Sequence, residues 1–297
     1  MLAVVGDIVE DIVVWTSGPI TLGTDNQSTI FRTRGGSAAN VAGFAASTHP
    51  TRFIGCIGDD YVGQFLVDEL TSAGVDVCVQ RAGTTGTIAV LIGEDGERTM
   101  FPNRAASTML ESVDVSWLDG VRMLHIPAYS FDGEPIRSTT LELIAQATAR
   151  NIDISLDASS THIIAKHGVE NFIELLAEIE PRFLIANFDE AQLLGFHQPD
   201  TAQALLSRMP TTVCVLKAGS EPTQVLRHRH DPLIVAVAPV SQIIDTTGAG
   251  DAFAAGFLTS FLSTADLVQA CESGHSRARM VLQSPGASSG TAPAASG

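Results

Sequence analysis

Short apolar runs alternate with stretches of helical periodicity through most of this chain. Four of the runs lie at 123–126, 152–156, 183–186 and 212–216. Segments with apolar residues at helical spacing separate them, near 138–149, 169–178 and 201–208. This alternation predicts a mostly parallel sheet covered by helices. Ligands bind at the carboxyl ends of the strands in such sheets, and Asp157, Asn187 and Lys217 follow three of the predicted strands.

The first third of the chain is more varied. Its predicted strands lie at 2–5, 12–15, 52–57, 87–92 and 99–101. Its predicted helices lie at about 41–47, after Asn40, and at 61–73. Residues 16–34 are rich in Ser, Thr, Gly and Asn, and residues 93–98 are typical of a hairpin turn. These features predict a small β-rich excursion from the main body.

The stretch from Asp245 to Phe253 carries the strongest chemical signal. An apolar run at 233–238 precedes it, and phenylalanines at helical spacing follow it. The loop Gly248-Ala249-Gly250 would therefore open a helix, whose free backbone amides and dipole attract anions. Asp251 repels phosphate, so it suits a base that takes a proton from a hydroxyl attacking a phosphoryl group. The same residues also fit a plain helix cap after a tight turn.

Composition narrows the class of protein. The 297 residues are 45% hydrophobic, which indicates a folded globular chain, and the formal net charge is −16. Such a charge argues against nucleic-acid or anionic-membrane partners, which need a basic surface. The four cysteines are far apart in the sequence, so we expect reduced thiols. The sequence also shows no basic N-terminal segment and no apolar run long enough to cross a membrane, so we expect a cytoplasmic location.

Four segments together resemble the motifs of the ribokinase-like (PfkB) carbohydrate kinases. In chain order they are Gly35-Gly36-Ser37-Ala38-Ala39-Asn40, Asn187-Phe188-Asp189-Glu190, Leu216-Lys217-Ala218-Gly219-Ser220 and Asp245-Thr246-Thr247-Gly248-Ala249-Gly250-Asp251. The resemblance implies a kinase that transfers the ATP γ-phosphate to a hydroxymethyl group, with Mg²⁺ as cofactor. It also implies an α/β core at 1–11, 34–83 and 105–287 and a β lid at 12–33 and 84–104. The Ser-, Ala- and Gly-rich composition of residues 288–297 predicts a disordered tail.

The resemblance assigns roles to individual residues. Asp251 would be the catalytic base, and the backbone at Gly248, Ala249 and Gly250 the anion hole. The residues expected to bind the sugar are Asp11, Gly35, Gly36 and Asn40. Those expected at the nucleotide are Asn187, Glu190, Lys217, Gly219 and Ser220, of which Asn187 and Glu190 would hold Mg²⁺ through water. A K⁺ site would use Asp245 and Thr247, with a carbonyl from Gly286, and the lid could pair two subunits into a homodimer.

Departures from the family pattern leave the acceptor open. Val9 stands where ribose-specific members tend to carry Asn, and Ala158-Ser159-Ser160 follows Asp157 where many sugar-acid and fructose kinases place an Asn and an Arg. Arg104 could reach an acidic sugar, although a surface ion pair is the simpler expectation. A nucleoside kinase and a non-catalytic sugar or nucleotide sensor remain alternatives, whereas the P-loop and nicotinamide-binding motifs are absent from the sequence.

Overall fold

The structure, a computed structural model, describes residues 1–93, 98–240 and 242–283. Most of the turn expected at 93–98, the carbonyl of Gly286 and the tail expected at 288–297 lie outside these residues. Among the described residues, no helix combines the length and hydrophobicity needed to cross a membrane.

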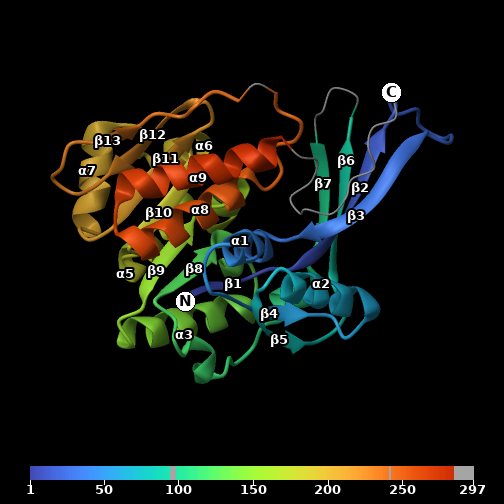
Figure 1. The fold of residues 1–297 in the computed structure, drawn as a ribbon, viewed down its shortest axis with the longest axis horizontal. Coiled ribbons are helices and arrows are strands. Elements are labelled where there is room, and N and C mark those ends of the chain that lie inside the picture. The colour runs from blue at the N-terminus through green and yellow to red at the C-terminus, as the bar shows by residue number, and fades with distance from the viewer. Residues whose placement is uncertain (94–97, 241, 284–297) are drawn as a thin grey trace.

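A nine-stranded sheet forms the centre of the molecule (Figure 1). Its order is β13-β12-β11-β10-β9-β8-β1-β4-β5, and the seven strands from β11 to β5 run parallel. The strands of this sheet are β1 Leu2–Val5, β4 Thr51–Ile57, β5 Asp76–Arg81, β8 Met123–Pro127, β9 Asp153–Asp157, β10 Phe183–Asn187, β11 Val213–Ala218, β12 Glu221–Leu226 and β13 Leu233–Val235. This mostly parallel sheet confirms the predicted α/β architecture. Its strands are buried on both faces, and such a sheet requires helices that cover it.

Helices cover both faces of this sheet. They are α1 Ser37–Ala46, α2 Tyr61–Ser72, α3 Ile136–Ala149, α4 Thr161–His167, α5 Val169–Ile179, α6 Phe188–Leu194, α7 Pro199–Arg208, α8 Ala249–Thr264 and α9 Leu267–Leu282, with short 3₁₀ turns η1 Ala105–Thr108, η2 Val115–Leu118 and η3 Ala128–Phe131. Alternate residues of β1 point to opposite faces. Leu2 and Val4 join a core with α1, α2, α8 and α9, and Ala3 and Val5 join one with α3 to α7.

A second sheet of four strands stands to one side of the first (Figure 1). Its order is β3-β2-β6-β7, and its strands are β2 Val9–Thr16, β3 Ser28–Gly35, β6 Gly86–Ile92 and β7 Arg98–Asn103. Val13, Val90 and Ile92 form its small core, while Ile30 and Phe101 are more than half exposed. The ends of β2 and β3 lead directly to the residues described next.

The apolar run at 233–238 is shorter in the structure than predicted. Only Leu233–Val235 pairs, and it does so antiparallel to β12, a strand that the sequence analysis did not predict. Strand β5 and helices α4, α6 and α9 were not predicted from the sequence either. Strand β12 begins with Glu221-Pro222, and both residue types are rare in strands. The strand forms because a two-residue turn after β11 returns the chain antiparallel to that strand.

Candidate active site

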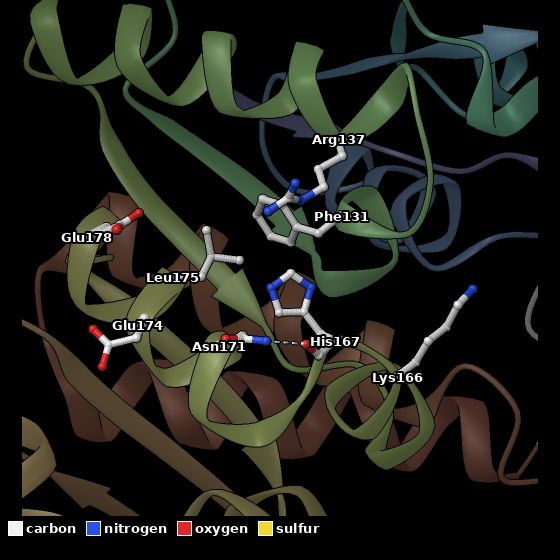
Figure 2. A pocket seen from close by; sticks show the side chains of 8 residues that line it. All are labelled: Phe131, Arg137, Lys166, His167, Asn171, Glu174, Leu175 and Glu178. Carbon is white, nitrogen blue, oxygen red and sulfur yellow. Dashed lines mark hydrogen bonds between the residues drawn. The ribbon is translucent and has the colours of Figure 1, made fainter.

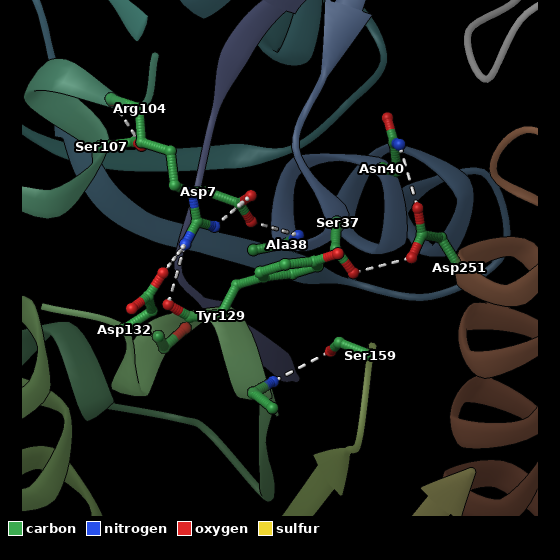
Figure 3. A network of polar contacts seen from close by, with 12 residues as sticks. Asp7, Ser37, Ala38, Asn40, Arg104, Ser107, Tyr129, Asp132, Ser159 and Asp251 are labelled. Carbon is green, nitrogen blue, oxygen red and sulfur yellow. Dashed lines mark hydrogen bonds and ion pairs between the residues drawn. The ribbon is translucent and has the colours of Figure 1, made fainter. Parts of the chain in front are cut away.

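Asp251 lies in the first turn of α8 and is held by α1. The hydroxyl of Ser37 donates to its Oδ1 at 2.7 Å, and Nδ2 of Asn40 donates to its Oδ2 at 3.0 Å (Figure 3). Burial, the largest influence, raises the pKa of Asp251 to about 7, while these two hydrogen bonds act in the opposite direction. The structure therefore brings a carboxyl group with a pKa of about 7 into direct contact with Asn40, which was expected to bind the sugar.

The loop before α8 has the geometry that the sequence predicts for a helix opening. Gly248 is the N-cap with a φ of 76°, in the left-handed region that favours glycine. The amide of Ala249 donates to the carbonyl of Thr246 at 3.3 Å. A Cβ on Gly250 would lie 3.5 Å from Nζ of Lys217, so this ammonium group lies directly beside the loop.

Lys217 reaches the loop from the end of β11. Its Nζ donates to Oδ2 of Asp157 on β9 at 3.2 Å. Burial acts to lower the pKa of Lys217, but the carboxylates of Asp157 and Glu190 outweigh it and the pKa is raised. The ammonium group is thus charged, largely buried and available to an anion at the opening of α8. From the sequence, Asp157 was expected only at the end of a strand, and its contact with Lys217 was not predicted.

Asn187 and Glu190 form a capping box at the start of α6. The Glu190 carboxylate accepts from the backbone amide and from Nδ2 of Asn187, both at 2.8 Å, and Oδ1 of Asn187 accepts from the Glu190 amide. Burial first, and then Asp157, raises the pKa of Glu190 to about 7. A buried carboxylate beside a second one fits a divalent cation, because the cation would offset their repulsion. Within the described residues, no group of three acidic, His or Cys side chains is close enough to bind a metal directly.

Asp11 lies on β2 against the turn between β3 and α1. A Cβ on Gly35 would collide with the Asp11 carboxylate, and one on Gly36 would lie 2.6 Å from the carbonyl oxygen of Asp7. Gly36 also has a φ of 95°. Burial, followed by the Asp7 charge, raises the pKa of Asp11 to about 7. Its buried Oδ1 has no hydrogen-bond partner within the described residues, so it is an acceptor that a ligand hydroxyl could fill.

The remaining expected residues lie in two turns. Oδ1 of Asp245 accepts from the amide and the hydroxyl of Thr247, at 2.8 and 2.7 Å, which closes the turn before Gly248. Gly219 and Ser220 form the exposed turn between β11 and β12. No described hydrogen bond joins these two residues to Asp251.

Three neighbours of the site did not stand out in the sequence as binding residues: Ser37, Tyr129 and Asp7. Tyr129 follows the end of β8, and burial first, then Asp7, raises the pKa of its phenol. Arg104 donates to Asp7 at 2.8 Å and lies 4.6 Å from the centre of the Tyr129 ring (Figure 3). The expected ion pair of Arg104 is therefore present, but the side chain is only 16% exposed, so the pair is largely buried and does not lie on the surface. The position of Tyr129 after a buried strand was the available signal.

A cavity of about 510 Å³ lies apart from this group, between η3, α3 and the α4–α5 pair (Figure 2). Arg137 and Lys166 line it together with Glu174 and Glu178, so its charges have both signs. Lys166 also pairs with Asp132 at 2.6 Å. These opposing charges do not select a ligand.

Comparisons with known proteins show the family and the fold of this chain. The model of the pfkB family carbohydrate kinases matches residues 1–295. An ATP-dependent ribose-1-phosphate kinase from Halopiger xanaduensis is 30% identical over 80% of this chain and 76% of its own length. A fructokinase from Vibrio alginolyticus is 27% identical over 85% of each chain. The adenosine kinase structure from Sinorhizobium meliloti has a TM-score of 0.85 at 21% identity, covering 96% of this chain and 94% of its own. A putative ribokinase II from E. coli has a TM-score of 0.84 at 19% identity, covering 98% of this chain and 95% of its own. The chain therefore belongs to the pfkB family of carbohydrate kinases.

Proposed function

We propose that this protein transfers the γ-phosphoryl group of ATP to a hydroxymethyl group of a sugar or related polyol. The observation that carries the proposal is the carboxyl group of Asp251, held by Ser37 and Asn40 at the opening of α8 with a pKa near 7. A base with such a pKa is ionised in part at neutral pH and can accept a proton there.

In the proposed mechanism, Asp251 accepts the proton of the acceptor hydroxyl as that oxygen attacks the phosphoryl group. The backbone amides at Gly248, Ala249 and Gly250 and the ammonium group of Lys217 would stabilise the charge that develops on the phosphoryl oxygens, with the Ala249 amide exchanging its 3.3 Å bond to the Thr246 carbonyl for the phosphate. Gly250 lacks a side chain, which allows the phosphate to approach both groups closely.

The acceptor would lie between Asp11, Gly35, Gly36 and Asn40. Oδ1 of Asp11, which no side chain or amide of the described residues fills, supplies a hydrogen-bond acceptor, and the second hydrogen on Nδ2 of Asn40 supplies a donor. A polyol offers hydroxyl groups that satisfy both. The small sheet would form a lid that excludes water from the transfer.

The nucleotide would lie beside Lys217, Gly219 and Ser220. Mg²⁺ would be held through water by Asn187 and Glu190, and there it neutralises phosphate charge. Asp245 and Thr247 would hold K⁺. The exposed apolar side chains of Ile30 and Phe101 on the small sheet support a homodimer formed through this lid. A cytoplasmic location stays a prediction.

The test is ATP-dependent ADP release against a panel of pentoses, hexoses, sugar acids, sugar phosphates and nucleosides, with Asp251→Asn as control. Phosphorylation of a sugar or polyol by the wild type alone supports the proposal. A nucleoside as the preferred acceptor would assign a nucleoside kinase. Sugar binding by calorimetry without turnover would contradict catalysis and favour a sensor.

A further inference from the structure

Arg34 is a buried cation directly behind the candidate active site. It lies near the end of β3, and its side chain is 5% exposed. Its Nη1 donates to Oδ1 of Asn40 at 3.0 Å, and its Nε donates to Oε1 of Glu69 on α2 at 3.2 Å. Asn40 in turn donates to Asp251. A continuous chain of contacts thus runs from α2 through β3 and α1 to α8.

We infer that Arg34 is a positioning residue that fixes the side-chain amide of Asn40, so that Nδ2 and not Oδ1 faces Asp251 throughout the reaction. The inference rests on the proposed role of Asp251 as base, and it deepens that role.

The chemistry of the three groups carries the inference. A guanidinium group only donates hydrogen bonds, and an ionised carboxylate only accepts them, whereas an amide has one end of each kind. Asn40 lies between Arg34 and Asp251, so a single amide orientation satisfies both neighbours. A flipped amide would place two donors together on one side and two acceptors together on the other.

Arg34 matters most once Asp251 has accepted a proton. A protonated carboxyl group can donate, so Asp251 alone would then tolerate either amide orientation. Arg34 still holds Oδ1 of Asn40, and the amide therefore keeps donating to Asp251. This donation favours the ionised form of Asp251 and so helps it to release the proton before the next turnover.

The surroundings hold Arg34 rigidly. Glu69 is 32% exposed and supplies the anion that a buried guanidinium group requires. Gly43 on α1 leaves the space, because a Cβ there would lie 2.8 Å from Nη2 of Arg34. A buried group fixed by its packing can orient a neighbour with little loss of entropy.

Other charged side chains near Arg34 and Asp251 also influence the pKa values of these two groups. Arg34 is affected by Glu69, Asp251 and Asp11, and the burial of Arg34 lowers its pKa. Asp251 is affected by Asp157 and Asp7, and it acts in turn on Lys217. Removing Arg34 would change this field as well as the amide, and a test must separate the two effects.

A double-mutant cycle makes that separation. Arg34→Met, Asn40→Ala and the double variant are compared with the wild type for kcat, the KM of ATP and the pH profile of kcat. We expect Arg34→Met alone to lower kcat roughly tenfold and to move the acid limb upward by about half a unit, with little change in the KM of ATP. In the Asn40→Ala background the same substitution should change kcat less than about threefold, because no amide remains to be oriented.

Arg32→Met is the matched control. Arg32 lies two residues earlier on β3, pairs with Glu10 at 3.1 Å and is 63% exposed, so its replacement should leave kcat and the acid limb unchanged. Arg34→Lys should restore most of the kcat and the wild-type acid limb, because it retains a charged donor for Asn40. If Arg34→Met does not fold by circular dichroism, Glu69→Gln takes its place in the cycle, because it weakens the ion pair that holds Arg34, and its smaller effect on kcat should again disappear without Asn40.

Equal effects of Arg34→Met with and without Asn40 would overturn the inference, because Arg34 would then act through its charge or through packing. That result leaves the proposed function intact if Asp251→Asn still abolishes turnover. If Asp251→Asn turns over normally, the base assignment fails and the role of Arg34 fails with it.

Discussion

Replacing Asp251 with Asn tests the chemistry and the energetics of the site together. The variant keeps the size of the side chain and removes its ability to accept a proton. We expect kcat to fall by about 10²–10⁴-fold, the range for loss of a general base. ATP should still bind with nearly wild-type affinity, because the backbone of the loop and Lys217 are unchanged.

The raised pKa adds a second consequence with a defined sign. A carboxyl group whose pKa rises from 3.8 unfolded to about 7 folded favours the folded state at low pH, and this contribution is lost as pH rises between those values. The neutral Asn does not incur this loss. Between pH 5 and pH 7 the folded carboxyl group stays largely protonated while the unfolded one is ionised, so over these 2 pH units the wild type loses up to about 3 kcal/mol of stability relative to the variant.

The assays are ADP release for kcat, calorimetry for ATP, and thermal denaturation at pH 5 and pH 8. The Tm of the variant relative to the wild type should be higher at pH 8 than at pH 5. Near-normal turnover would refute the base assignment. A Tm difference that does not change with pH would refute the raised pKa, even if turnover is lost.

The other predictions concern the groups around Asp251. Asp11→Ala and Asn40→Ala should each raise the KM of the acceptor at least tenfold with little change for ATP, and an unchanged KM would remove them from the acceptor site. Gly35→Ala should also raise the acceptor KM, because its methyl group would displace the Asp11 carboxylate; Gly18→Ala is the control and should leave this KM unchanged, because a Cβ there would meet no atom within 4 Å. Lys217→Met should lower kcat by about 10²-fold, and a normal kcat would show that Lys217 only neutralises Asp157. Glu190→Gln should raise the Mg²⁺ concentration needed for half-maximal rate, and an identical Mg²⁺ titration would contradict the role of Glu190.

The sequence predicted the parts of this protein that depend on local pattern. Buried parallel strands are continuous apolar runs, so the central sheet and most of its helices were predictable. The helix opening at Gly248 was predictable because it needs small residues and a left-handed cap. Strand β12 and helix α9 were missed, since their formation depends on tertiary pairing and on packing against α8.

The candidate site shows the same division. The residue types at 35–40 and 245–251 indicated the chemistry, but not which groups touch. No sequence pattern predicts that Ser37 donates a hydrogen bond to Asp251, or that the buried guanidinium group of Arg34 donates one to Asn40. Such contacts depend on the relative placement of α1 and α8, which only the packed core determines.

The bond between Asn40 and Asp251 joins positions 211 residues apart. During synthesis, α1 leaves the ribosome long before α8 exists, and the face of the sheet that α8 will cover stays open until then. A nascent chain that stops short of α8 can contain the strands of the small sheet and of the central sheet, yet it lacks the Asp251 carboxylate that Ser37 and Asn40 of α1 bind. A chain terminated before α8 would therefore lack the proposed base altogether, and we expect it to have no kinase activity.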